Sequence, residues 1–213
     1  MTAPPAFVFV YGSLLQPASL QATLPTVSWR RCVPAVVSGR RRDFGVAFPN
    51  DGTQPDKAYL DDQDVRPPVV LFANLRPAGP AESVNGICVP VGPGELAQLE
   101  ARELRYDTVD VTDAVRASDA VAATDAVGAT AAADVTHAAR PSPSLTRVVT
   151  FVGKPEFTRA PDVAAGVVPV AYTDSIDAGA RFWDRHVSGF HADLRRSTDW
   201  PDPSAVVPLR RVG

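Results

Sequence analysis

The sequence contains few cysteines, no long hydrophobic run and no excess of positive charge. Its only cysteines, Cys32 and Cys88, are far apart and form no C-x-x-C pair, so the sequence indicates neither a disulfide framework nor a zinc site. We expect both thiols to be buried and reduced. A net charge of -3 provides no positive field for a nucleic acid or an anionic membrane. Neither is therefore expected as a partner.

Two further absences concern the location of the protein. No apolar run approaches the length of a bilayer span, and the N-terminal segment MTAPPAFVFVYGSLLQ lacks the basic region and the cleavage site of a secretory signal. We therefore expect a cytoplasmic protein. With 213 residues, of which 45% are hydrophobic, the chain can bury a substantial core. We expect a single domain over residues 1–213, as a monomer or a homodimer.

Six segments are rich in Val, Phe or Ile and bounded by Gly, Pro or Asp, a pattern typical of β-strands. They cover residues 7–11, 32–38, 68–74, 84–91, 106–111 and 147–152. A helix is predicted between residues 92 and 103, and a second from about residue 171. The second helix has one apolar stripe, in which Trp183 and Phe190 are the expected core anchors. The pattern predicts a sheet or barrel of about six strands.

Two polar segments interrupt this pattern. Residues 113–144 consist mainly of Ala, Asp, Thr and Val with a recurring Asp-Ala-Val tripeptide, and they contain no aromatic residue. This composition favours a mobile low-complexity insertion, although an alanine-rich helix is the alternative. Residues 50–68 are also polar and predict a long surface loop between strands.

Glu103 is the candidate for chemistry on the first helix. Leu96 and Leu99 define its buried stripe, and at about 100° per residue Glu103 falls on the same side. Burial of an ionised carboxylate is costly and raises its pKa, which suits proton transfer. The same spacing places Glu95 and Arg102 on the solvent side. Alternatively, the helix ends before Glu103, which is then an ordinary last-turn residue.

Four motifs occur in a recognisable order: FVFVYGSLL, SGRRRDFG, VNGICVPV and LEARELRY. In this order they resemble the gamma-glutamylcyclotransferase family, which has Y-G-S-[LN] in a first loop, then G-x-x-R-x-F, V-x-G-x-x-[YV], and L-[DE]-x-x-E followed by tyrosine. The resemblance covers most of residues 7–112. It implies an α+β fold, a small mixed β-barrel of about six strands with flanking helices.

The resemblance also implies roles for particular residues. Tyr11, Gly12, Ser13 and Leu14 match the substrate loop, whose backbone amides would hold the alpha-carboxylate of a gamma-glutamyl group. Glu103 matches the catalytic acid/base. The implied reaction cyclises the gamma-glutamyl group of a small-molecule substrate to 5-oxoproline and releases an amino acid, peptide or amine. No metal or organic cofactor is required, because nucleophile and electrophile belong to one molecule.

Other residues leave the substrate open. Tyr106 is a candidate hydrogen-bond partner of the Glu103 carboxylate or of the substrate; alternatively it opens the next strand and packs in the core. Leu104 and Thr108 stand where many members of the family have glycine and arginine. Two rival functions stay open: a non-catalytic binder of small amino-acid-like ligands, and an interaction module that uses the alanine-rich insertion.

Five residues have simpler interpretations. Arg41 and Arg42 belong to a charge cluster that is expected to be a solvated face, or alternatively to draw an anionic peptide to the pocket mouth. His186 and His191 are five residues apart, which does not match zinc ligands on one helix face, and they are expected at the surface. Ser13 lacks the G-x-S-x-G elbow of a nucleophile.

Overall fold

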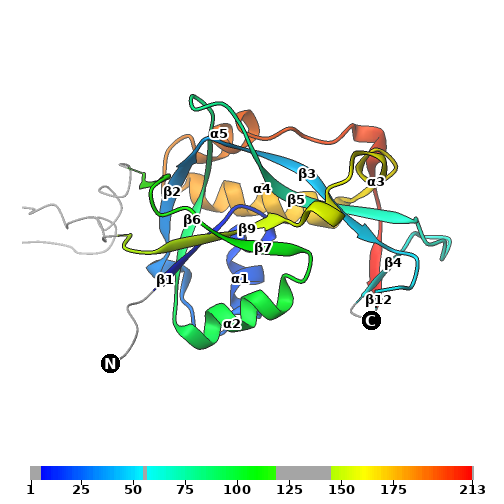
Figure 1. Cartoon of the computed structure of the whole chain (residues 1–213), viewed down its shortest axis with the longest axis horizontal. Coiled ribbons are helices and arrows are strands. Elements are labelled where there is room, and N and C mark those ends of the chain that lie inside the picture. The colour runs from blue at the N-terminus through cyan, green and yellow to red at the C-terminus, as the bar shows by residue number, and fades with distance from the viewer. Residues whose placement is uncertain (1–5, 55–56, 119–144, 213) are drawn as a thin grey trace, which may run out of the picture.

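The computed structural model describes residues 6–54, 57–118 and 145–212, and it is built around a six-stranded mixed sheet (Figure 1). The strands of this sheet are β1 (Ala6–Val10), β2 (Val33–Ser38), β6 (Ser83–Val91), β7 (Tyr106–Asp110), β8 (Val115–Ala117) and β9 (Val148–Gly153). Their order is β7-β9-β1-β6-β2-β8. All neighbours are antiparallel except β1 and β9, which are parallel.

Strand β1 lies inside the sheet and is the centre of the core. All five of its residues are buried, as its unbroken apolar run predicts for a strand covered on both faces. It pairs with β6, where Gly86 lies against it so closely that an added Cβ would come within 2.5 Å of the Val10 carbonyl oxygen. Only glycine fits at this position without displacing the strand.

Three further strand pairs lie outside the central sheet. Strand β3 (Arg40–Pro49) pairs antiparallel with β5 (Val69–Pro77), and β10 (Val168–Pro169) pairs parallel with β11 (Val206–Val207). Strand β4 (Ala58–Leu60) pairs antiparallel with β12 (Arg210–Val212) at one side of the molecule (Figure 1). The β4–β12 pair joins a segment that was predicted to be a loop to the C-terminal end of the described chain.

The helices cover the sheet from two sides. They are α1 (Pro17–Thr23), α2 (Pro93–Arg102), α3 (Ala160–Ala164), α4 (Val170–Asp184) and α5 (Phe190–Arg196), with short 3-10 turns η1 (Ser13–Leu15), η2 (Trp29–Arg31), η4 (Pro155–Phe157) and η5 (Pro203–Ala205). Helices α1 and α2 lie together below the strands, and α4 crosses behind them (Figure 1). Trp183 of α4 and Phe190 of α5 are buried, as predicted.

The single helix expected after residue 171 is two helices. Gly189 between them has a φ of 81°, a left-handed conformation that glycine adopts without strain, and the chain turns there. The apolar stripe continues across this turn because both helices pack on the same core. Its periodicity alone therefore did not show the break.

The α+β fold is confirmed, with one difference in the sheet. Residues 68–74 form part of β5, which pairs with the unpredicted strand β3, and the sixth strand of the central sheet is β8. Strands β7 and β8 are its edges, so this sheet is open and only loosely resembles a barrel. Strand β8 lies within the predicted insertion; residues 119–144 of that insertion lie outside the described residues.

Two further predictions concern the cysteines and the absence of a membrane span. Cys32 and Cys88 are buried free thiols, as predicted, and burial raises the pKa of each to about 12. Both thiols are therefore protonated at neutral pH and unreactive. In the part of the chain that the structure describes, no helix is long and apolar enough to cross a membrane.

Candidate active site

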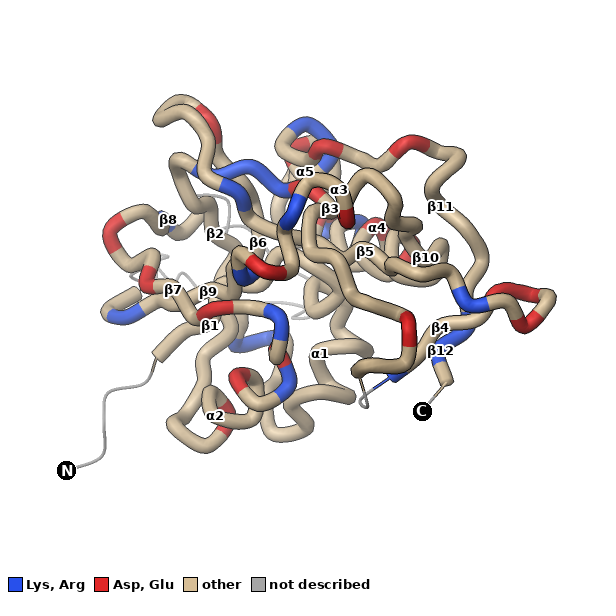
Figure 2. Tube along the Cα trace, turned by 45° about the vertical axis from the view of Figure 1, so that its right-hand side comes forward, with Lys and Arg blue, Asp and Glu red and all other residues tan. Residues whose placement is uncertain are grey.

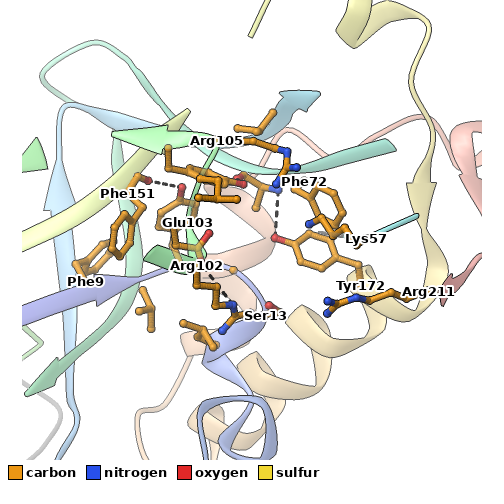
Figure 3. Close-up of a pocket in the computed structure, with 18 of the residues that line it drawn as sticks. Phe9, Ser13, Lys57, Phe72, Arg102, Glu103, Arg105, Phe151, Tyr172 and Arg211 are labelled. Atoms are coloured by element: carbon orange, nitrogen blue, oxygen red, sulfur yellow. Dashed lines mark hydrogen bonds and ion pairs between the residues drawn. The ribbon is translucent and has the colours of Figure 1, made fainter. Parts of the chain in front are cut away.

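A cavity of about 300 Å³ opens where β1 ends, beside the C-terminal end of α2. It is lined by residues from the β1 turn, α2 and the segment after it, α4, and the β4–β12 pair (Figure 3). Glu103 and Ser13 lie near its centre, and Lys57, Tyr172 and Arg211 lie together on one side (Figure 3). Segments separated by 200 residues thus meet around one space.

The turn after β1 forms one wall of the cavity. Gly12 has a φ of −108°, which lies outside the left-handed region that would by itself favour glycine. The structural reason is space, because a Cβ at this position would lie 3.1 Å from the Tyr172 hydroxyl oxygen. The 3-10 turn η1 follows directly, and no side chain caps its N-terminus. Its first amides have no partner within the turn and are available to an anion.

Glu103 follows the last residue of α2. The helix ends at Arg102, as the simpler alternative held, and the Glu103 amide still donates to the Leu99 carbonyl oxygen at 2.9 Å. The side chain is nevertheless only 22% exposed and lines the cavity. The end of the helix therefore directs a carboxylate into the site.

The electrostatic surroundings of Glu103 act in two directions. Burial raises the pKa of its carboxyl group, while the positive charges of Arg102, Lys57 and Arg105 partly lower it. The Arg102 Nε atom lies 3.6 Å from the Glu103 Oε1 atom. Arg102 is exposed, as predicted, and it also lines the cavity, where it pairs with the carboxylate.

Three tyrosines form the remaining polar wall. The Tyr106 hydroxyl donates to the Ala73 carbonyl oxygen at 2.8 Å, and the Ala73 amide donates to the Tyr172 hydroxyl oxygen at 3.2 Å. The Tyr11 hydroxyl donates to the carbonyl oxygen of Phe151 at 2.6 Å. Burial is the main cause that raises the pKa of all three hydroxyls, so they are protonated at neutral pH.

Comparisons with known proteins identify the fold. No family model and no curated protein matches the sequence. Among solved structures, a gamma-glutamyl cyclotransferase aligns with a TM-score of 0.55 at 13% identity, over 96% of this chain and 94% of the other. The chain has the gamma-glutamyl cyclotransferase fold.

Two further structures agree with this assignment. YkqA from Bacillus subtilis aligns with a TM-score of 0.51 at 19% identity, over 91% of this chain. The alignment spans about half, 54%, of YkqA. An uncharacterized protein from Homo sapiens aligns with a TM-score of 0.52 at 13% identity, over 94% of this chain and 93% of the other. At these identities the likeness establishes the gamma-glutamyl cyclotransferase fold, and activity has to be argued from the site.

All of the residues that the sequence proposed for the site line the same cavity. They are Tyr11, Gly12, Ser13, Leu14, Glu103 and Tyr106. Tyr106 is part of the wall, and its proton is donated to a backbone carbonyl. The two histidines that the structure describes have other partners: His191 bonds to Asp177 at 2.6 Å, and the His186 ring lies 5.2 Å from the Trp29 ring in a tilted arrangement. Both are partly buried and not fully at the surface as expected.

Six polar residues of the cavity lining were not predicted as site residues from the sequence: Lys57, Tyr59, Arg102, Arg105, Tyr172 and Arg211. Lys57 and Arg211 reach the cavity through the β4–β12 pair, a contact between segments 150 residues apart that leaves no local pattern. Arg105 follows Glu103 by two residues. This proximity to the candidate acid was the one feature of the sequence that could have indicated a place in the site.

Arg41 and Arg42 are not at the mouth of this cavity. Arg42 is fully buried and donates to the Asn85 carbonyl oxygen at 2.5 Å and to the Thr198 hydroxyl at 2.7 Å. Arg41 forms ion pairs with Glu82 at 3.1 Å and with Asp199 at 2.6 Å. Arg41 and Arg42 of β3 therefore hold the segment of this chain that follows α5.

Proposed function

We propose that this protein cyclises a gamma-glutamyl group to 5-oxoproline and releases the attached amine. The observation that carries the proposal is the position of Glu103, a carboxylate with a raised pKa in the cavity that the β1 turn also lines. The fold it shares with a gamma-glutamyl cyclotransferase supports the same conclusion.

The substrate would bind with its gamma-glutamyl end innermost. Its alpha-carboxylate would accept hydrogen bonds from backbone amides at Gly12, Ser13 and Leu14. Its alpha-ammonium group would then face Glu103. Arg102 and Lys57 contribute positive charge beside the carboxylate, which opposes the rise in its pKa that burial causes.

Glu103 would act first as a base. It accepts a proton from the alpha-ammonium group, and the freed amine attacks the gamma-carbonyl carbon to close a five-membered ring. The carboxyl group then gives this proton to the nitrogen of the leaving amine as the amide bond breaks. The ring nitrogen gives its second excess proton to the released amine, which leaves as an ammonium ion. The products are 5-oxoproline and this amine, and Glu103 returns to its ionised form.

A product assay tests the proposal. The purified protein is incubated with gamma-glutamyl dipeptides, gamma-glutamyl-lysine and glutathione, and 5-oxoproline is measured. Formation of 5-oxoproline from any of them supports the proposal. If these compounds raise the melting temperature and none is converted, the protein is a non-catalytic binder of the same fold.

A further inference from the structure

The described cavity lining carries an excess of positive charge. Glu103 is its single carboxylate, and the cations are Lys57, Arg102, Arg105 and Arg211. With Glu103 ionised the lining has a net charge of about +3, the four cations less the one carboxylate. A bound gamma-glutamyl group is itself a zwitterion and leaves this excess unchanged. The cavity is therefore suited to a ligand with a further negative charge.

Three of these cations have contacts that fix them on the protein. Arg102 pairs with Glu103 at 3.6 Å. The Arg105 guanidinium lies 4.5 Å from the ring centre of Phe48, and the Lys57 ammonium lies 4.3 Å from that of Phe72. Arg211 is exposed at the cavity, and within the part of the chain that the structure describes it makes no ion pair.

The register of β12 directs Arg211 toward the cavity. Arg211 stands opposite Tyr59 of β4, and residues opposite one another in an antiparallel pair share a face. Tyr59 also lines the cavity, so this face of the strand pair is the cavity face. The preceding residue, Arg210, alternates to the other face and pairs with Asp64. Figure 2 shows these basic residues on β12 beside β4.

We infer that Arg211 binds a carboxylate on the leaving portion of the substrate and so selects gamma-glutamyl compounds whose departing amine carries that group. This inference rests on the proposed function, because it assigns the outer part of the same cavity. The inner gamma-glutamyl end occupies the β1 turn and Glu103. Arg211, supplied by the C-terminal strand, then meets the other end of the molecule as a specificity residue without contact to the reacting atoms.

A matched pair of substrates tests this inference. Gamma-glutamylglycine carries the leaving-group carboxylate, and gamma-glutamylglycinamide has a neutral amide of nearly the same shape in its place. We expect kcat/KM of the native protein to be about 10- to 100-fold higher for the acid, the range of a charge-assisted hydrogen bond. The Arg211→Gln variant should lose most of this preference by reacting more slowly with the acid and at an unchanged rate with the amide.

Arg210→Gln is the matched control, because it removes the same charge from the adjacent position on the opposite face. It should leave the preference for the acid intact. The inference is overturned if the native protein converts both substrates equally, if Arg211→Gln slows both substrates by the same factor, or if Arg210→Gln abolishes the preference as well.

A protein without cyclotransferase activity would be recognised by a different measurement. If the native protein forms no 5-oxoproline from either compound, calorimetric titration of both into the native protein and the two variants decides the inference. Tighter binding of the acid that Arg211→Gln removes and Arg210→Gln keeps would support the carboxylate site in a non-catalytic binder. Equal binding of acid and amide would overturn it.

Discussion

The substitution Glu103→Gln separates chemistry from folding at this site. It keeps the shape of the side chain and removes its ability to accept a proton. We expect turnover of a gamma-glutamyl substrate to fall by about 10²–10⁴-fold, which corresponds to roughly 3–5 kcal/mol of lost transition-state stabilisation. Binding of the substrate should persist, because the β1 turn is unchanged. The assay is 5-oxoproline formation, with calorimetry for binding.

The same variant should not lose stability at neutral pH. The pKa of Glu103 is raised in the folded protein, mainly by burial, so the folded state holds the proton more tightly than the unfolded chain. Stability therefore falls as pH rises from the ordinary glutamate pKa through the raised one, and the full cost is present above it. Because glutamine carries no charge, the variant should melt at the same or a higher temperature than the native protein at pH 7.

Glu100→Gln is the control for both measurements. Glu100 lies on the same helix, is exposed and accepts a hydrogen bond from Thr108 at 3.2 Å outside the cavity. It should leave turnover unchanged. The native kcat/KM should also rise with pH through the raised pKa of Glu103. Turnover retained by Glu103→Gln, or a melting temperature several degrees lower at pH 7, would refute the reasoning.

Three further substitutions test the framework around the site. Gly86→Ala places a Cβ 2.5 Å from the Val10 carbonyl oxygen and should cost about 1–3 kcal/mol in urea unfolding, whereas an unchanged midpoint would contradict the close approach. Arg42→Met removes hydrogen bonds from a fully buried guanidinium and should lower the free energy of unfolding by roughly 3 kcal/mol; a smaller loss than that of Gly86→Ala would argue against its role as a fastener. Tyr172→Phe removes the acceptor of the Ala73 amide and should cost about 1 kcal/mol by thermal unfolding, and no change would indicate that water replaces it.

Local sequence patterns predicted those strands and helices whose burial follows from their own apolar residues. The apolar run of β1 and the Leu96 and Leu99 stripe of α2 were sufficient, because burial of each is a local consequence of composition. Strand β3 was missed because three arginines open it, and Arg42 is buried through contacts with residues more than 150 positions later. The sequence does not indicate these distant partners of the Arg42 guanidinium, because they come together only in the folded chain.

The candidate site divides in the same way. Glu103 and the Tyr11 to Leu14 turn, which both line the cavity, were predicted from motifs, since each lies in a short segment with a recognisable local pattern. Arg211 belongs to the site only because β12 pairs with β4, and no feature of a terminal arginine indicates that pairing. The inner part of the cavity was therefore predictable from the sequence, and its outer, charged side was not.

The end of α2 shows how one residue could serve as both acid and base in the proposed reaction. The carbonyl groups at a helix C-terminus present partial negative charge, which disfavours a carboxylate there and acts in the same direction as burial. Arg102 and Arg105 flank Glu103 along the chain and act in the opposite direction. A base must be ionised before the reaction and must hold the proton long enough to return it. The end of α2 brings these opposing effects on the Glu103 pKa together within four residues, so we expect an extension of α2 past Glu103 to change their balance even if the carboxylate were kept.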